Sequence, residues 1–172
     1  MQRQALHWFR PLTSVADYEP ERFPVYMWSH PVAPGEPSTE LYGFPHQPGD
    51  EGVKAALYHD WLETDVDPDA LRRTVSESEW RTVQQLLAQS LPGLAGDCVT
   101  STVCMYPGTP DDDFVLGVHP GSEGRVVLAQ GFSGHGFKFV PVVGEIVADL
   151  VVDGTTRHEI GFLSPERYAV RG

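Results

Sequence analysis

Residues 125–145 read Arg125-Val-Val-Leu-Ala-Gln-Gly-Phe-Ser-Gly-His-Gly-Phe-Lys-Phe-Val-Pro-Val-Val-Gly-Glu145, and the apolar pattern then continues to Asp153-Gly154. This order predicts a strand, a glycine-rich loop and a helix. Glycines let such a loop turn sharply and approach a bound group, and the free N–H groups of a helix start favour an anion there. The spacing of Gly131, Gly134 and Gly136 is not GxGxxG, so it does not indicate a dinucleotide phosphate loop. A tight strand-to-helix turn with a solvated lysine explains the pattern equally well.

Outward from this segment, short strand-like runs are separated by turn residues. The clearest helix begins with Ser76-Glu-Ser-Glu79, which has the spacing of a capping box, and it stops at Pro92-Gly93. Acidic residues fill the loop at 63–69, and Gly and Pro together number 32 of 172, so many turns are expected. Strands are predicted over 23–29, 40–45, 52–59, 97–106, 114–118 and 125–129.

The composition is that of a folded domain, with 41% apolar and 21% charged residues among 172. Acidic residues outnumber basic ones 24 to 12, for a net charge of −12, which argues against nucleic acid as a partner. The amino end lacks an apolar run of signal-peptide length, and charges interrupt the most apolar segment, 139–152. We therefore expect no membrane span and a cytoplasmic location.

Few residues suggest chemistry by pattern alone. Cys98 and Cys104 lie in one extended segment, where about 20 Å would separate them, too far for a disulfide. A lone strand cysteine such as Cys104 is usually a small buried hydrophobe. No HxH, HExxH or paired CxxC occurs, so we expect no metal site. Three consecutive acids at 111–113 are interpreted as a solvated turn.

Two longer segments are recognisable together. Cys104-Met-Tyr-Pro-Gly-Thr-Pro-Asp-Asp-Asp-Phe-Val and the segment 125–145 closely resemble the C-terminal half of the monomeric sarcosine oxidase and N-methyl-tryptophan oxidase family. These are FAD-dependent amine oxidases of the D-amino-acid-oxidase-like superfamily. Residues 2–9, 41–45 and 52–59 are similar to strands of the family's substrate domain, so the resemblance covers essentially the whole chain.

The resemblance implies a role for particular residues. Cys104 matches the cysteine that is bonded to the 8α-methyl group of FAD, which reverses the interpretation drawn from its strand alone. Lys54 matches the lysine that promotes the reaction with dioxygen, and Tyr42 matches an aromatic residue of the substrate cavity. The family often has a histidine four residues beyond the lysine. Tyr58 occupies that place here, and the next residue, His59, is a candidate for substrate binding although strand alternation directs it to the opposite face from Lys54.

The glycine-rich loop carries the remaining implied site. Lys138 matches the cationic partner of the substrate carboxylate, and His135 matches a position near the flavin and that carboxylate. The cofactor-binding segment implied by the resemblance is Gly134, His135, Gly136, Phe137 and Lys138. Catalytic roles fall to Lys54, Lys138 and His135.

The resemblance also implies the fold and the division of the chain. We expect an α+β fold, with a mixed, largely antiparallel substrate-domain sheet followed by C-terminal strands and a helix. Residues 1–95 are expected to belong to the substrate-binding domain and residues 96–172 to the flavin-site segment. The family's N-terminal Rossmann part, with its GxGxxG, has no counterpart here. We therefore expect a missing half or a partner chain that supplies it, and this chain alone to be inactive.

The leading hypothesis is a portion of an oxidase of secondary-amine amino acids such as sarcosine. Such an enzyme uses FAD and dioxygen and yields an imine, then an aldehyde and an amine, with hydrogen peroxide. Two alternatives remain open at this point. The chain could belong to an amine dehydrogenase of the same fold, or it could be a non-catalytic truncated remnant or split subunit that does not hold FAD by itself.

Overall fold

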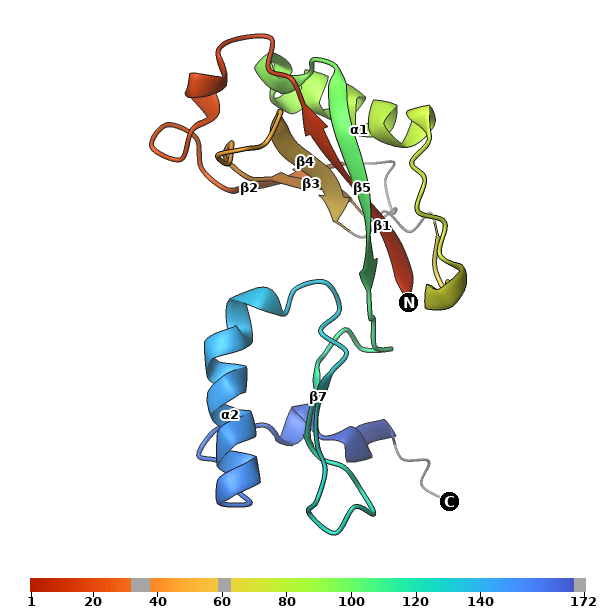
Figure 1. Ribbon diagram of the computed structural model, residues 1–172, viewed down its shortest axis with the longest axis vertical. Coiled ribbons are helices and arrows are strands. Elements are labelled where there is room, and N and C mark those ends of the chain that lie inside the picture. The colour runs from red at the N-terminus through yellow and green to blue at the C-terminus, as the bar shows by residue number, and fades with distance from the viewer. Residues whose placement is uncertain (32–37, 59–62, 169–172) are drawn as a thin grey trace. The chain divides into compact units, whose positions relative to one another are not determined.

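The computed structural model describes residues 1–31, 38–58 and 63–168. The chain divides into two compact units, which we call the sheet unit (Gln2–Met105) and the hairpin–helix unit (Tyr106–Gly172 together with Met1). Each unit has its own cluster of buried apolar side chains. Figure 1 shows the elements of both units, and the candidate site residues are distributed over the two.

The sheet unit contains a five-stranded sheet in the order β2-β3-β4-β1-β5. The β2–β3, β3–β4 and β4–β1 pairs are antiparallel. Local sequence explains one shortened strand, because Pro24 lacks an N–H for a ladder bond and the strand predicted from residue 23 begins at Tyr26. The strands are β1 (Gln2–Phe9), β2 (Tyr26–His30), β3 (Thr39–Gly43), β4 (Val53–Tyr58) and β5 (Cys98–Tyr106).

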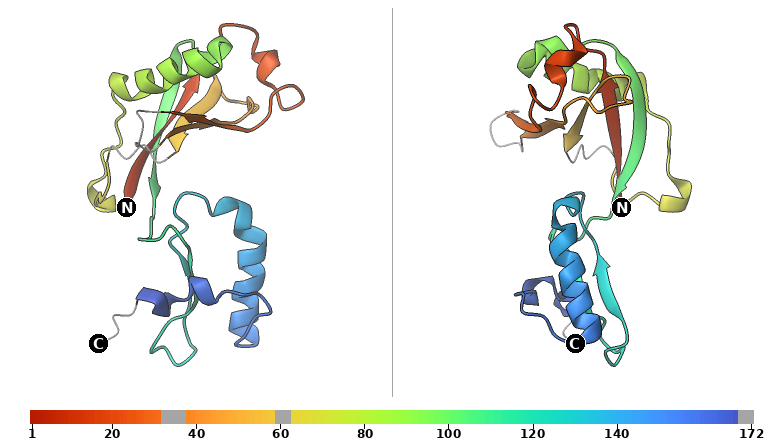
Figure 2. Two further views of the ribbon diagram at one scale, coloured as in Figure 1. Left: turned by 180° about the vertical axis from the view of Figure 1, so that it is seen from behind. Right: turned by 60° about the vertical axis from the view of Figure 1, so that its left-hand side comes forward.

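Helix α1 (Glu77–Ser90) covers one face of this sheet, as both views in Figure 2 show. Its predicted capping box is present, since the Ser76 N–H donates to the Glu79 carboxylate at 2.7 Å. The helix directs Val83 and Leu87 into the sheet, and both are almost fully buried. The core of the unit consists of Phe9, Tyr18, Leu41, Val53, Ala55, Val83, Leu87 and Leu94.

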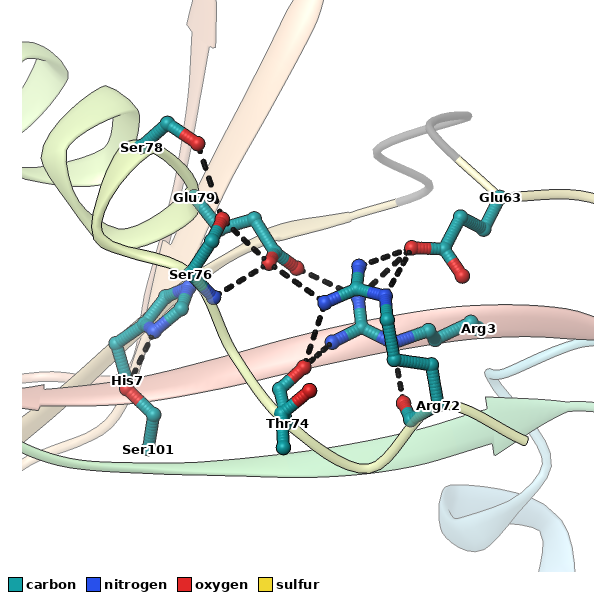
Figure 3. Close-up of polar contacts among 9 residues, drawn as sticks. All are labelled: Arg3, His7, Glu63, Arg72, Thr74, Ser76, Ser78, Glu79 and Ser101. Atoms are coloured by element: carbon teal, nitrogen blue, oxygen red, sulfur yellow. Dashed lines mark hydrogen bonds and ion pairs between the residues drawn. The ribbon is translucent and has the colours of Figure 1, made fainter.

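A buried ion cluster joins the start of α1 to strand β1 (Figure 3). The Arg3 side chain is 1% exposed, and its guanidinium donates to Glu79 Oε1 at 2.6 Å and to the Thr74 carbonyl at 2.7 Å. Arg72 bridges Glu63 and Glu79. Because each buried charge has opposite charges or carbonyl groups as partners, the cluster fixes the approach to α1 against β1.

The hairpin–helix unit is built from a two-stranded antiparallel sheet and one helix. Strands β6 (Val115–Val118) and β7 (Val127–Gln130) pair, and α2 (Val140–Val152) follows the glycine-rich loop after a short 3₁₀ turn at Phe137–Phe139. Apolar residues of α2 and β6 meet residues of the C-terminal segment in the core, which consists of Phe114, Leu116, Ile146, Leu150 and Leu163. The predicted strand, loop and helix are therefore confirmed, and Asp153 is the C-cap of α2.

The acidic triplet 111–113 has a structural role that the pattern did not indicate. Asp111 accepts hydrogen bonds from Arg167 at 2.9 Å and from the Tyr168 hydroxyl, which ties the C-terminal segment to the unit. Hydrogen bonds from Arg167 and Tyr168 hold the pKa of the Asp111 carboxyl well below its ordinary value. The interpretation of a purely solvated turn therefore omitted this contact.

The α+β class with antiparallel sheets and two helices agrees with the expected fold. The two compact units part between Met105 and Tyr106. The functional division at residues 95 and 96 stays a prediction.

Neither helix in the described ranges has the length and apolar character that crossing a membrane would require.

Candidate functional site

Strand pairing gathers a group of side chains on the face of the sheet opposite α1. Val53 and Ala55 of β4 lie in the core beneath α1, so the alternate residue Lys54 points to the other side. Trp8 of β1 is directly opposite Lys54, and Tyr42 of β3 is directly opposite Ala56. We call this side the distal face and define it by Trp8, Tyr42, Lys54 and Cys104.

Lys54 lies among aromatic rings on the distal face. Its Nζ is 5.1 Å from the ring centroid of Phe44, 5.8 Å from that of Trp8 and 5.9 Å from that of Tyr42. These distances are within the range of cation–π attraction. Burial lowers the pKa of Lys54, while the nearby Cys104 and Asp50 act in the opposite direction. The ammonium is thus half-buried, with carboxylate charge near it but no described carboxylate in ion-pair contact.

Cys104 lies near the end of β5 with an exposed side chain, and its thiol is free. On the same strand Ser101 contacts His7 Nδ1 at 2.9 Å, and His7 alternates with Trp8 along β1. Strand alternation therefore places Cys104, three residues beyond Ser101, on the side of Trp8. Its electrostatic interaction with Lys54 agrees with that placement. The expectation that Cys104 is an exception to the usual buried strand cysteine gains support from its exposure.

Tyr42 contributes an aromatic wall beside Lys54. Its ring centroid is 6.1 Å from that of Phe44 and 6.5 Å from that of Tyr58, both nearly perpendicular. Lys54, Ala56 and Tyr58 are alternate residues of β4, so they share one face of the sheet. His59, the weaker candidate for substrate binding, lies outside the described residues.

The glycines of the loop in the hairpin–helix unit serve close packing within that unit. Gly131 and Gly134 have φ of 66° and 77°, in the left-handed region that favours glycine. A Cβ on Gly134 would lie 2.5 Å from the Tyr106 ring, and one on Gly136 would lie 2.6 Å from Phe132. The absence of a Cβ at Gly134 and Gly136 therefore leaves room for the Tyr106 and Phe132 side chains. The approach of this loop to a bound group stays a prediction.

His135 is held in place by two contacts within the same unit. Its Nε2 lies 3.1 Å from the Asp112 carbonyl oxygen, and its ring lies 4.9 Å from that of Phe114, tilted by 35°. With Phe114, Phe139 and Phe162 it lines an apolar pocket of about 310 Å³. The imidazole is thus positioned at a polar edge of an otherwise apolar hollow.

Lys138 lies on the surface of the hairpin–helix unit. Its Nζ is 5.3 Å from the Phe139 ring centroid, and the adjacent Phe137 is 92% exposed. Within the described ranges, neither Lys54 nor Lys138 forms an ion pair with a carboxylate, although most of the arginines do. In a chain with twice as many acids as bases, such cations remain available to an external anion.

The structure thus brings some predicted site residues together and leaves others in a separate unit. Lys54, Tyr42 and Cys104 belong to the sheet unit. The hairpin–helix unit contains the segment from Gly134 to Lys138. Sequence reasoning missed Trp8, Phe44 and Asp50, because their proximity to Lys54 depends on strand register and on a loop that folds back.

Among described residues, no group of three or more His, Cys, Asp or Glu is placed to hold a metal ion.

A family model described as FAD dependent oxidoreductase matches residues 12–150. The chain belongs to that family. It is 42% identical to monomeric sarcosine oxidase of Streptomyces avermitilis over 98% of this chain and 42% of that protein. It is 40% identical to monomeric sarcosine oxidase of a Bacillus species over 76% of this chain and 33% of that protein. N-Methyl-L-tryptophan oxidase of Salmonella heidelberg is 30% identical over 81% of this chain and 35% of the relative.

Solved structures support the same fold. The open form of NikD, an amino acid oxidase of nikkomycin biosynthesis, matches with a TM-score of 0.65 at 24% identity, over 95% of this chain and 41% of that one. Fructosamine oxidase from Aspergillus fumigatus matches with a TM-score of 0.66 at 20% identity, over 94% of this chain and 36% of that one. The chain therefore spans about two-fifths of the length of monomeric sarcosine oxidase of Streptomyces avermitilis and of NikD.

The residues of the sheet unit fit a flavin of this family. A free, exposed thiol and a half-buried ammonium interact on one face of one sheet. A thiol can be bonded to a cofactor only where it is reachable, and a fixed cation acts best where water is partly excluded. The distal face meets both requirements.

Proposed function

We propose that this chain is part of an FAD-dependent oxidase that acts on the CH–NH bond of N-methyl amino acids such as sarcosine. The observation that carries the proposal is the placement of Lys54 and Cys104 on the distal face of a chain 42% identical to a monomeric sarcosine oxidase. Bound FAD supplies the acceptor for the hydride equivalent that leaves the carbon next to the amine nitrogen. The overall reaction converts the amine, dioxygen and water to an aldehyde, a smaller amine and hydrogen peroxide.

Two residues of the sheet unit have roles toward the cofactor and dioxygen. Cys104 holds the cofactor covalently through its exposed sulfur. Lys54 holds a positive charge near the place where dioxygen gains an electron. That charge interacts weakly with neutral dioxygen and strongly with the negative charge that develops on it, so it lowers the barrier and leaves binding almost unchanged.

Substrate binding is assigned to Lys138, Tyr42 and His135. Lys138 binds the carboxylate of the amino acid, for which it is suited because no described carboxylate pairs with it. Tyr42 supplies an aromatic wall, and His135 orients the substrate from its fixed position beside Phe114. The segment from Gly134 to Lys138 contributes backbone N–H groups to the cofactor. The GxGxxG half that binds the FAD phosphates comes from sequence outside this chain or from a partner chain.

The covalent role of Cys104 is tested by denaturing and precipitating the flavin-loaded protein. Yellow colour should remain with the precipitate of the unmodified protein and pass to the supernatant for Cys104→Ala. The matched control is Cys98→Ala, on the same strand, and it should keep the colour in the precipitate. Colour retained by Cys104→Ala would refute the tether, and so would colour lost from the unmodified protein.

The two lysines are expected to affect different half-reactions. Lys54→Met should slow reoxidation of the reduced protein by dioxygen at least about a hundredfold, because a fixed charge near the reacting oxygen is lost. Lys138→Met should raise the KM for the amino acid and leave reoxidation unchanged. Stopped-flow absorbance measures both steps separately. Equal effects of both variants on both steps would contradict the assignment, and turnover without peroxide under air would favour a dehydrogenase.

A further inference from the structure

The loop between β3 and β4, residues 44–52, places a carboxylate against strand β1. The Asp50 N–H donates to the Gln47 carbonyl at 3.0 Å, and His46 Nε2 lies 3.0 Å from the Asp50 carbonyl oxygen, so the loop is closed on itself. The Asp50 side chain then accepts a hydrogen bond from the indole Nε1 of Trp8 at 2.8 Å. This contact joins residues 42 positions apart in the sequence.

The same indole lies beside Lys54. Trp8 is the direct strand partner of Lys54, and its ring centroid is 5.8 Å from Nζ. Asp50 acts on Lys54 electrostatically, so its carboxylate lies near the ammonium. None of the ion pairs among the described residues joins Lys54 to Asp50, and the two groups interact only through space. The indole therefore binds the carboxylate with its N–H and the ammonium with its ring face.

This arrangement has a definite physical consequence. A carboxylate that accepts the indole N–H pushes electron density into the ring, which strengthens the attraction between ring and ammonium. The Asp50 carboxylate still favours the charged form of Lys54 through space, but it does not form an ion pair with the ammonium. Asp50 thus opposes the effect of burial on the pKa of Lys54 without an ion-pair contact to the ammonium.

We propose that Trp8 and Asp50 are positioning residues for Lys54: the indole N–H anchors the Asp50 carboxylate through Oδ2, and the indole ring holds the ammonium on the distal face without a direct ion pair. This inference rests on the proposed role of Lys54 with dioxygen. It concerns how the chain places and charges that lysine. Burial lowers the pKa of Lys54, and the described titratable groups facing it that oppose this are Cys104 and Asp50, which agrees with the arrangement.

The test is a pH titration of the Lys54 ammonium in the full chain labelled with ¹³C- and ¹⁵N-lysine. The chain has two lysines, and the signal missing from Lys54→Arg assigns its ¹³Cε resonance. Trp8→Phe keeps a ring but frees Asp50 to pair directly with Lys54, so the pKa of Lys54 should rise. Asp50→Asn keeps an acceptor for the indole but removes the charge, so the pKa should fall. Shifts of the Lys54 pKa in opposite directions would distinguish the proposed arrangement from a general loosening of the fold, which would move both variants alike.

Matched substitutions serve as controls. Trp28→Phe removes another partly exposed indole from the same sheet, and Glu51→Gln removes a neighbouring charge in the same loop. Both should leave the Lys54 titration unchanged. In the combined Trp8→Phe and Asp50→Asn variant the rise should disappear, because no carboxylate remains to pair. Shifts of Lys54 in the same direction for both single variants, or none for either, would overturn the inference.

A second readout separates this inference from the proposed function. In flavin-loaded protein, Trp8→Phe should slow reoxidation by dioxygen about tenfold, because Asp50 then pairs directly with Lys54 and partly neutralises its charge. Reduction by the amine should be unchanged. The pH profile of reoxidation should move with the Lys54 titration. If the titrations shift as described but reoxidation does not change, the positioning holds and the role of Lys54 with dioxygen fails.

Discussion

At the scale of single residues, charge placement distinguishes the two lysines from the arginines. Arg3, Arg72 and Arg167 stabilise the fold through ion pairs and backbone carbonyls. Lys54 is partly removed from water among aromatic rings, and Lys138 is exposed beside one ring. The division is physically reasonable, since a planar guanidinium suits bidentate structural contacts and an ammonium is a compact charge for a ligand or reacting atom.

His7 and Glu79 lie near Arg3, and their shifted pKa values lead us to expect that the free energy of unfolding falls in acid. Burial lowers the pKa of His7 to about 4 from an ordinary value of 6.5, with a smaller opposing effect of Glu79. Burial by itself would raise the pKa of Glu79, but hydrogen bonds from Ser76, Arg3 and Arg72 outweigh it and lower the pKa from 4.5 to about 2. In both cases the unfolded chain takes up protons before the folded chain does, so acid destabilises the fold.

The two groups should act in different pH windows. Neutral His7 contributes stability that is present above pH 6.5 and is lost as the pH falls toward 4, and Glu79 acts between about 4.5 and 2. His7→Asn should therefore flatten the free energy of unfolding between pH 6.5 and 4 relative to the unmodified chain. Glu79→Gln should flatten only the lower window. Urea unfolding at a series of pH values measures both, and identical slopes for all three proteins would contradict the assignment.

At the scale of elements, short-range pattern and close packing act together. The capping box starts α1, and the same Glu79 that completes it also binds Arg3 from β1. In the other unit, glycines allow the loop before α2 to pass against Tyr106 and Phe132. The sequence pattern predicted the capping box and the glycine-rich loop. It did not predict that Arg3 would bind Glu79, or that Tyr106 and Phe132 would pack against the glycines.

The glycine loop gives a matched pair of substitutions. Gly134 has φ of 77° and Gly154 has φ of 74°, but only at Gly134 would a new Cβ meet other atoms. Gly154→Ala should cost about 1 kcal/mol from backbone strain. Gly134→Ala adds a clash with the Tyr106 ring and should cost about 2–4 kcal/mol in all. Equal losses in free energy of unfolding would show that Tyr106 moves aside freely.

At the scale of the whole molecule, the chain consists of two units with separate cores and a strongly acidic surface. The net charge of −12 is spread over a chain whose two lysines are both candidate site residues. The apolar clusters of the two units share no residue. We therefore expect each unit to unfold as a cooperative unit of its own.

Two core substitutions should affect two different unfolding transitions. Trp8, Trp28 and Trp80 belong to the sheet unit, and no tryptophan occurs in the sequence after residue 80, so tryptophan fluorescence does not report on the hairpin–helix unit. Leu87→Ala should lower the fluorescence-detected stability by about 3 kcal/mol. Leu116→Ala should leave that transition in place and shift a second one seen by circular dichroism. A single transition moved equally by both substitutions would show one cooperative fold.

Some features of the site were predictable from sequence and others were not. The strand that contains Lys54, the strand that contains Cys104 and the loop before α2 follow from local alternation and turn residues. The placement of Trp8 over Lys54 needs the register between β1 and β4, 46 positions apart in the sequence. The Asp50 contact needs a loop that closes on itself, for which no periodic pattern exists.

Local sequence determined where strands and helices begin and end, because capping, alternation and turn chemistry act over a few residues. It also determined the family, through long ordered motifs around Cys104 and Lys138. Only the tertiary structure decided which charges are paired. Whether an ammonium meets a carboxylate or an aromatic ring depends on strand register and loop closure, and those are set by the burial of the entire sheet against α1.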